Sequence, residues 1–421
     1  MKILHTVESY LPNLCGMAEI VRQISERLVK KGHYVVVATS KDINRYENEI
    51  NGVIIKEFDI HGNLVSGIYG ESEKYIKYLS DEKFDIITNF AAQQWATDLV
   101  LPILKKLPGK KVFVPTGYSA FNLPQYQVYY KKLEEWLFDY DQIVYLSNDF
   151  RDINFARKLG LNNGIVITNG ASKEEFIYNK SINFRNNLGI PEENLLILHV
   201  SGYIGEKGHI DAIKIFTKSK IKNATLLFIS PAFQMPNRFN FMKILKSINL
   251  LIKGVFKDHH FLEVFQIQFY RILLFLRISK RNIKFISVDR TNTVEAFKHA
   301  DLFLFPSHNE CSPIVFFECM ASKTPFLTTD VGNAKEIINW CKSGVILPTV
   351  KEKSNFMRSH PIIKDSSKIL IELASDPDKR EMMAKSGYQT WLKKFTWEQI
   401  CEQYENVYKK LYEKGNEDRK K

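Results

Sequence analysis

Two carboxylates, Glu310 and Glu318, stand eight residues apart around a predicted helix start. An apolar strand over 302–305 precedes them, and Ser312 and Pro313 are expected to open the helix, where a proline is tolerated in the first turn. Exposed backbone N–H groups of that turn suit a phosphate or a hydroxyl-rich ligand, and a carboxylate can accept bonds from two neighbouring sugar hydroxyls. The spacing of the two Glu residues is also typical of a solvated helix face, so the spacing alone does not identify a binding site.

A lysine, Lys207, follows a predicted strand over 195–200 and a turn that contains Gly202. An ammonium group in such a turn can neutralise a phosphate, although a lysine there is more often at a surface helix end. No carboxylate pair of the DxD kind is placed for a metal, and Cys311 and Cys319 lack a His or Asp at metal-ligand spacing with both. We therefore expect neither a metal nor another cofactor.

Short β-branched runs alternate with longer segments of helical period, the pattern of parallel sheets covered by helices. The first cycle is a strand over 2–7, a helix over 18–31 and a strand over 34–38, and the pattern restarts at 195–200. Further strands are predicted over 84–88, 111–114, 142–146, 165–167, 225–229, 283–286, 302–305, 326–329 and 345–347. A chain of 421 residues in this pattern is expected to form two doubly wound α/β domains.

About fifty residues separate the predicted strands over 225–229 and 283–286, which indicates an insertion over about 235–281. Residues 238–281 hold nine Lys and Arg against two acidic residues, and the apolar residues of 241–255 recur at helical spacing. A basic amphipathic helix favours an anionic membrane surface, while packing on the second domain or a dimer seam is the alternative. Nucleic acid is not expected, because no binding motif accompanies the charge.

The net charge of +12 is unevenly distributed, since residues 1–180 hold 22 basic and 22 acidic residues against 37 and 25 in the remainder. Five cysteines without a CxxC pair argue against a disulfide framework and favour a reducing compartment. The first residues enter a strand directly and lack the pattern of a secretory leader. We expect a cytoplasmic protein, with peripheral attachment at the inner face of the cell membrane through 238–281 as a further option.

These motifs resemble family 4 of the nucleotide-sugar-dependent glycosyltransferases, retaining enzymes with the GT-B fold. The family pattern of a Glu, seven residues and a second Glu matches Glu310 and Glu318, followed by Met320-Ala321 and Pro325. The resemblance covers nearly the whole chain. The other matching segments, in order, are KILHTVESYLPNLCGMAE, LSNDF, ITNGASKEEF, SGYIGEKGH, HADLFLFPS and FTWEQICEQYENVYKKLY.

The resemblance implies two facing Rossmann-like doubly wound domains and a C-terminal helix that crosses back to the first. Residues 1–180 would form the acceptor-side domain and 181–395 the domain that binds the nucleotide sugar. Residues 396–421 would form the crossing helix and a charged tail.

The resemblance also implies roles for individual residues. Glu318 would hold the ribose hydroxyls of the donor, Glu310 would face the donor sugar, and Lys207 would neutralise the diphosphate. Glu310 and Lys207 are thus the expected catalytic residues. The expected donor-binding residues are Glu318, Gly16, Gly202, Tyr203, Ser312, Pro313, Ile314 and Arg290.

The chain departs from the family pattern in both domains. Tyr203 stands where relatives have an Arg that pairs with the Lys on the diphosphate. Arg290 could compensate, with a solvent-facing loop arginine as the alternative. Thr116 stands in the stretch where relatives often carry a His near the donor sugar, and Cys15 replaces the first glycine of a usual pair.

The expected function is that of a retaining glycosyltransferase. It would move a hexose from a UDP- or GDP-sugar to a polysaccharide or lipid-linked oligosaccharide acceptor, by the front-face substitution that the resemblance implies. Two alternatives stay open. One is a GT-B sugar-nucleotide epimerase or phosphorylase, and the other is a non-enzymatic GT-B relative that binds a membrane or a partner.

Overall fold

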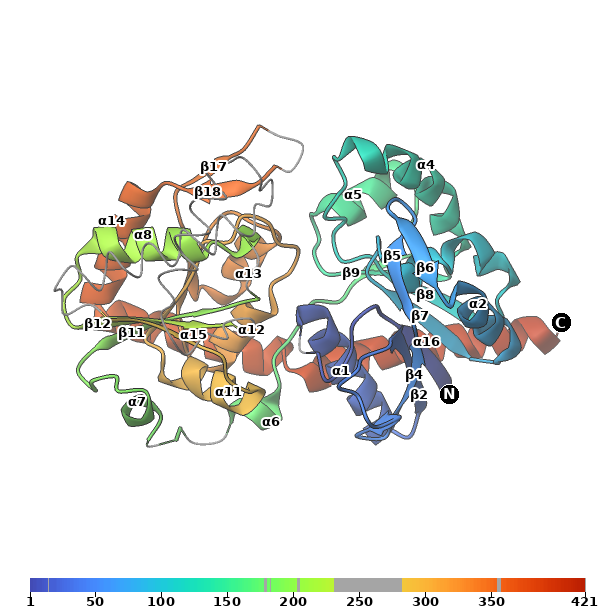
Figure 1. Ribbon diagram of the computed structural model, residues 1–421, viewed down its shortest axis with the longest axis horizontal. Helices are drawn as coiled ribbons and strands as arrows, with labels where there is room; N and C mark the ends of the chain where they lie inside the picture. Colours follow the sequence, from blue (N-terminus) through green and yellow to red (C-terminus); the bar gives the residue numbers. More distant parts are fainter. Residues whose placement is uncertain are drawn as a thin grey trace, which may run out of the picture.

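Two parallel β-sheets, each covered by helices, form two lobes of the computed structural model (Figure 1). The structure describes residues 1–13, 15–177, 180–181, 183–202, 205–230, 282–353 and 357–420. The insertion predicted over 235–281, with its membrane interpretation, and Tyr203 therefore lie outside the described residues.

The first sheet has eight strands in the order β10-β9-β8-β7-β1-β2-β4-β3. All its pairs are parallel except that of β3 with β4. Its strands are β1 (Lys2–Thr6), β2 (Tyr34–Ser40), β3 (Glu49–Ile50), β4 (Val53–Phe58), β7 (Ile86–Phe90), β8 (Lys110–Val114), β9 (Gln142–Tyr145) and β10 (Gly164–Val166). From β4 across β1 to β9, the parallel strands follow the chain order 3-2-1-4-5-6 of a Rossmann domain.

Helices and a small hairpin complete this domain. The helices are α1 (Gly16–Lys30), α2 (Ser72–Asp81), α3 (Trp95–Asp98), α4 (Gln127–Trp136) and α5 (Arg151–Lys158). A separate antiparallel hairpin, β5 (Ile60–Asn63) with β6 (Gly67–Gly70), follows β4. The strands read as apolar runs because helices bury both faces of the sheet, and five residues of β2, Val35–Thr39, are fully buried or nearly so.

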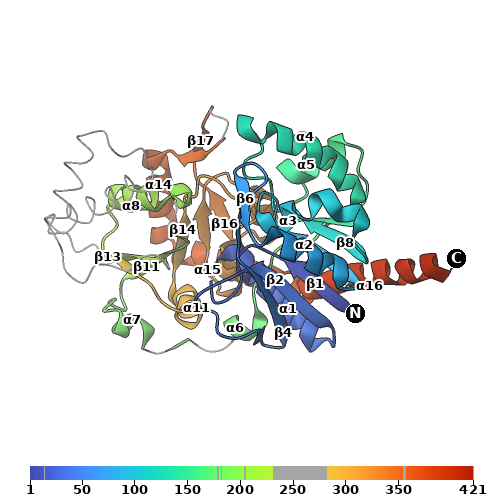
Figure 2. The same ribbon diagram turned by 45° about the vertical axis from the view of Figure 1, so that its right-hand side comes forward.

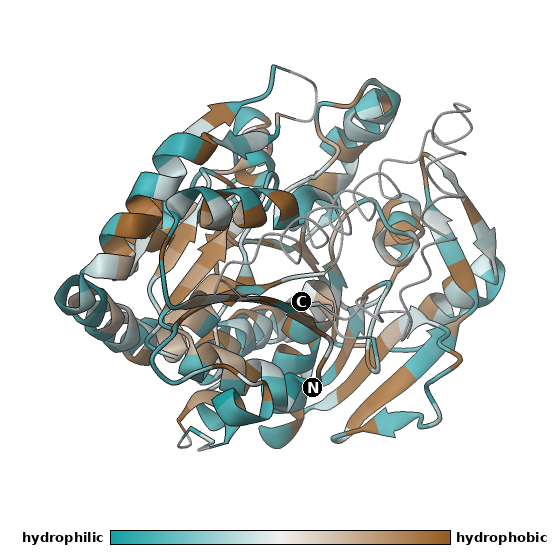
Figure 3. Ribbon diagram, turned by 60° about the vertical axis from the view of Figure 1, so that its left-hand side comes forward, coloured by the Kyte–Doolittle hydropathy of each residue, from teal (hydrophilic) through white to brown (hydrophobic). Residues whose placement is uncertain are grey.

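The second sheet has six strands in the order β13-β12-β11-β14-β15-β16, which is again 3-2-1-4-5-6. Its strands are β11 (Leu195–Val200), β12 (Ala224–Ile229), β13 (Asn282–Ile286), β14 (Leu302–Phe305), β15 (Phe326–Thr328) and β16 (Gly344–Ile346). The helices around it are α6 (Lys173–Phe176), α7 (Phe184–Asn187), α8 (His209–Ser219), α11 (Arg290–His299), α12 (Ile314–Ala321), α13 (Ala334–Cys341), α14 (Ile363–Ser375) and α15 (Pro377–Lys394). The prediction of two doubly wound domains is confirmed. Figure 3 shows the strands of the sheets as largely apolar ribbon between more polar helices.

The last helix, α16 (Trp397–Lys420), crosses back and runs under the first domain, as Figures 1 and 2 show. Its apolar face belongs to the core of that domain, where Trp397, Ile400, Tyr404 and Tyr408 are buried against α1 and the sheet. The Tyr408 hydroxyl lies 2.7 Å from Thr88 Oγ1 and 3.2 Å from His5 Nε2. The expected crossing helix is therefore present.

A second hairpin, β17 (Thr349–Lys351) with β18 (Ser359–Pro361), was not predicted and lies at the edge of the second domain near α8 (Figure 1). No helix within the described ranges has both the length and the apolar run that a bilayer crossing requires.

Candidate active site

Lys207 and Glu310, 103 positions apart in the chain, are in direct contact. The Lys207 ammonium donates a 2.7 Å hydrogen bond to Glu310 Oε1. The Ser307 hydroxyl donates to the same oxygen, also at 2.7 Å. The exposed fraction of the Glu310 side chain is 10%, so the carboxylate is held by two donors in a largely enclosed place.

The two residues meet because β11 and β14 are neighbouring parallel strands. Lys207 ends a short 3₁₀ turn (Gly205–Lys207) after β11, and Glu310 lies in the loop between β14 and α12. Gly208 fixes their approach, since it has φ +70° and a Cβ there would lie 2.0 Å from the Pro306 carbonyl oxygen. Only glycine allows both this conformation and this contact.

Glu318 lies one turn into α12 and takes part in a different network. Its side chain is buried, and its Oε1 accepts a 2.5 Å hydrogen bond from Arg290 at the start of α11. Arg290 also donates to Glu175 at 2.6 Å. Glu175 is bonded in turn to Arg22 on α1 at 3.1 Å, so this chain of charges extends from the second domain to the first.

Burial and these ion pairs shift the pKa values of Glu318, Arg290 and Glu175. Burial raises the pKa of Glu318, and the Arg290 guanidinium opposes that rise. Burial acts against the charge of Arg290, but Glu318 and Glu175 raise its pKa above the ordinary value of arginine. For Glu175, Arg290 and Arg22 outweigh burial and lower the pKa. Arg290 is therefore a paired, half-buried cation, and the alternative of a solvent-facing loop arginine is wrong.

A cavity of about 750 Å³ opens between loops of the two domains. Its lining includes Phe150 and Arg151 from the first domain and Asn309, Glu310 and Trp340 from the second. Glu310 thus faces the space between the domains, whereas Lys207 and Glu318 are not among the described residues that line this cavity. Of the three residues expected to converge, the structure joins Lys207 to Glu310 and places Glu318 in a separate network.

Residues of the first domain contact the second domain's loop that carries Glu310. Arg151 donates a 2.8 Å hydrogen bond to Asn309 Oδ1. Asn169 donates to the Ser312 carbonyl at 2.8 Å. Gly117, with φ +93°, approaches Cys311 so closely that a Cβ would lie 2.6 Å from the sulfur. The first domain therefore supports the second domain's loop by direct contact.

The remaining expected donor-binding residues lie at element ends. Helix α12 begins at Ile314, one residue after Pro313, which is its N-cap. Asn333 donates to the Ser312 hydroxyl at 3.1 Å, so Ser312 positions this helix start. Gly16 begins α1 and Gly202 follows β11, and a Cβ at either would meet no heavy atom within 4 Å. Packing within the described residues therefore does not require glycine at these two positions.

Three contacting residues, Ser307, Arg22 and Glu175, were not expected from the sequence. Ser307 stands three positions before Glu310 and donates to it. No sequence pattern distinguishes a serine with this role from other serines. Arg22 and Glu175 are 153 positions apart, and only the three-dimensional fold brings them together.

Two known protein families match the chain, one in each domain. Residues 180–390 match the family described as Glycosyl transferases group 1, and residues 15–174 match Glycosyltransferase Family 4. The chain belongs to the glycosyl transferases group 1 family. It is a glycosyltransferase with the GT-B fold, as the resemblance in the sequence indicated.

Two related proteins match over the length of this glycosyltransferase. An uncharacterized glycosyltransferase of Methanocaldococcus jannaschii is 26% identical and is aligned over 97% of this chain and 98% of its own length. The capsular polysaccharide biosynthesis glycosyltransferase CapM of Staphylococcus aureus is 20% identical, with 97% and 96% covered.

Solved structures match the fold at low sequence identity. Sucrose-phosphate synthase from Thermosynechococcus elongatus has a TM-score of 0.72 at 15% identity, with 98% of this chain and 99% of the other covered. Anabaena HepE in complex with UDP and glucose has a TM-score of 0.70 at 14% identity, with 97% and 100% covered.

Proposed function

We propose that this glycosyltransferase retains the anomeric configuration and moves a hexose from a UDP- or GDP-sugar to a polysaccharide or lipid-linked oligosaccharide. The observation that carries the proposal is the contact of Lys207 with Glu310 at the carboxyl edge of the second sheet. Ligands of doubly wound folds bind at this edge, and here a cation and a carboxylate meet there beside an interdomain cavity.

In this proposal Lys207 binds the diphosphate of the donor. Its ammonium group has three N–H donors, and within the described residues it uses one of them, on Glu310, so that two can bind phosphate oxygens. The negative charge that develops on the leaving diphosphate is then stabilised by a cation already in place. We propose no metal for this step, because Lys207 supplies the positive charge. The HepE structure with UDP and glucose makes UDP-hexoses the first donors to test.

Glu310 would stabilise the positive charge that develops on the sugar ring. The bond from the anomeric carbon to the phosphate oxygen breaks, and a bond from the same carbon to the acceptor oxygen forms on the same face. The acceptor hydroxyl gives its proton to the leaving diphosphate. Ser307 and Lys207 hold Glu310 in one orientation, so the carboxylate would need little reorganisation in the transition state.

Glu318 would accept hydrogen bonds from the ribose of the donor. Arg290 occupies Oε1, and among the described residues no hydrogen bond is made to Oε2. The guanidinium would therefore fix the carboxylate while one oxygen stays available to two neighbouring hydroxyls.

The acceptor would approach through the cavity between the domains. Phe121, Phe150 and Trp340 are part of its lining, together with charged side chains, and such mixed walls suit a glycan that presents both apolar ring faces and hydroxyls. The name of CapM supports a polysaccharide acceptor.

The basic composition of 238–281 supports attachment to an anionic membrane, at about 1 kcal/mol for each Lys or Arg near the surface. Co-sedimentation with phosphatidylglycerol vesicles tests this, with phosphatidylcholine vesicles as the control. Equal binding to both, or to neither, would contradict the attachment.

A thermal-shift panel of UDP, GDP, ADP and their hexose conjugates tests the donor proposal. A nucleotide present at 100 times its Kd adds about 2.7 kcal/mol of stability. We expect one base to raise the Tm of the wild type, with a much smaller rise for Lys207→Ala. Product formation with that donor then needs an acceptor, whereas turnover without one would favour an epimerase. Failure of every nucleotide to bind would contradict the proposal.

A further inference from the structure

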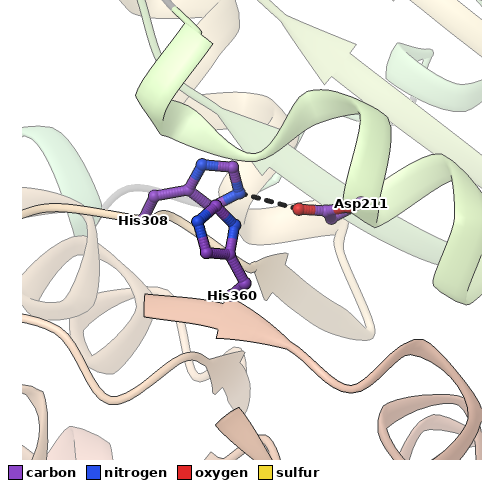
Figure 4. A group of neighbouring side chains, drawn as sticks. All are labelled: Asp211, His308 and His360. Atoms are coloured by element: carbon purple, nitrogen blue, oxygen red, sulfur yellow. Dashed lines mark hydrogen bonds and ion pairs between the residues drawn. The ribbon is translucent and has the colours of Figure 1, made fainter. Parts of the chain in front are cut away.

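Three metal-binding side chains from three separate elements gather beside the candidate active site. Figure 4 shows Asp211 on α8, His308 on the loop after β14 and His360 on β18 pointing toward one another. His308 stands two positions before Glu310, and Asp211 stands four after Lys207. The sequence could not show the cluster, because 97 positions separate Asp211 from His308.

The donor atoms of the three side chains lie within 4.8 Å of one another. His308 Nε2 and Asp211 Oδ2 are 2.7 Å apart, and the centroids of the two imidazole rings are 4.3 Å apart. Bonds of about 2.1 Å to a shared tetrahedral ion place donor atoms about 3.4 Å apart. Side-chain rotations that move each donor atom by about 1 Å would therefore bring all three to the separations of a tetrahedral site.

Backbone hydrogen bonds hold the ligands independently of their side chains. The His308 N–H donates to the Glu206 carbonyl at 2.7 Å, and the Ser359 N–H donates to the His308 carbonyl at 2.9 Å. The hairpin register adds a pairing of His360 with Val350. The main chains that carry His308 and His360 are thus fixed side by side.

The hydrogen bond between His308 and Asp211 does not explain why His360 lies beside them. His360 Nε2 lies 3.9 Å from Glu352, beyond hydrogen-bond distance, and among the described residues its ring makes no hydrogen bond. A second imidazole, tilted by 53° to the ring of His308, thus lies beside a histidine–carboxylate pair, and no hydrogen bond among the described residues occupies its ring nitrogens.

We propose that Asp211, His308 and His360 bind one divalent transition-metal ion of the zinc class. Two imidazoles and one carboxylate form a ligand set that such ions prefer, and water would complete the tetrahedron. The ion joins β18 to α8 and to the loop of Glu310. It therefore anchors the β17–β18 hairpin at the site edge and takes no part in sugar transfer.

Calorimetric titration of Zn²⁺ into the tag-free full chain, stripped with a chelator, tests the proposal. We expect one saturable equivalent in the wild type and a rise in its Tm. His360→Ala and Asp211→Asn should each weaken binding by more than the 10- to 100-fold that is typical of lost outer-shell contacts. Since His360 is partly exposed, its variant should fold, which circular dichroism checks.

Control variants test whether other histidines of the chain bind the ion. His61→Ala, on the exposed hairpin of the first domain, should bind Zn²⁺ as the wild type does. His259 and His260, which are adjacent in the sequence, offer another pair of imidazoles. The variant with both replaced by Ala should also bind Zn²⁺ as the wild type does. No saturable binding by the wild type would overturn the proposal. So would unchanged binding by His360→Ala, or loss of binding only in the His259/His260 variant.

Discussion

Arg290 reaches from the start of one helix to Glu318 inside another and donates it a 2.5 Å hydrogen bond. The same guanidinium holds Glu175, which in turn contacts Arg22 of the first domain. The sequence predicts Arg290 as a donor-binding residue that compensates for the arginine missing at position 203. In the structure the guanidinium pairs with two carboxylates, and its bond to Glu318 holds that side chain in place.

Replacing Arg290 with Ala should destabilise the protein, because Glu318 would become a buried carboxylate without its cation. Breaking a buried ion pair costs about 3–5 kcal/mol. Urea unfolding of the second domain measures the loss. Lys368→Ala, which removes an exposed ion pair with Asp365 and leaves the bond between Arg290 and Glu318 in place, is the control and should cost much less. Equal losses in the two variants would argue against this pairing as the main support of Glu318.

Glu310→Ala should reduce sugar transfer by at least about 100-fold, the usual cost of removing one electrostatic partner of a transition state. Initial rates with the donor selected by the nucleotide panel measure the effect. Ser307→Ala, which removes only one hydrogen bond to Glu310, should have a smaller effect. A fully active Glu310→Ala enzyme would refute the assignment.

Glu318→Gln should mainly weaken donor binding, by about 10-fold for the loss of one charge-assisted hydrogen bond to a ribose hydroxyl. The amide keeps the size of the side chain and an oxygen for Arg290. Calorimetry with the nucleotide alone should show the weakening, and kcat at saturating donor should change less than KM. A fall in kcat with unchanged donor affinity would contradict the role of Glu318 in ribose binding.

Glu405 on α16 should make stability depend on pH. Burial opposes its charge, but hydrogen bonds from Lys409, Lys31 and His33 lower the pKa of Glu405 to about 2. A folded-state pKa below the unfolded value means that this stability is present above about pH 4.5 and is lost as the pH falls toward 2. We expect a contribution of about 1 kcal/mol, since Lys31 and Lys409 are exposed enough for solvent to screen them.

Thermal unfolding of Glu405→Gln measures this contribution between pH 6, which is above the range where the carboxylate titrates, and pH 3, which is within it. The variant should be less stable than the wild type at pH 6 and approach it at low pH. Parallel curves for the two proteins would exclude Glu405 as a source of the pH dependence.

Much of the fold could be predicted because buried parallel strands read as apolar runs. The strand over 195–200 agrees with β11, and the strand over 84–88 lies two positions before the observed β7. The hairpin of β17 and β18 was missed, since its three-residue strands are too short for a periodic signal and one of them contains Pro361. Strand β4 was also missed, although its residues Val53, Ile55 and Phe58 are buried.

The candidate site was predictable only in part. Glu310, Glu318 and Lys207 stood out through motif spacing, and the contact between Lys207 and Glu310 follows from neighbouring strands. Glu175 and Arg22, which continue the network from Arg290, did not stand out, because pairing between distant segments leaves no local pattern in the sequence.

The crossing of α16 also affects how the protein forms during synthesis. His5 and Tyr408 are 403 positions apart, yet they lie in contact in the core of the first domain. The ribosome releases the first domain long before its last core helix exists. Part of the apolar surface of that domain therefore stays uncovered until α16 has been translated.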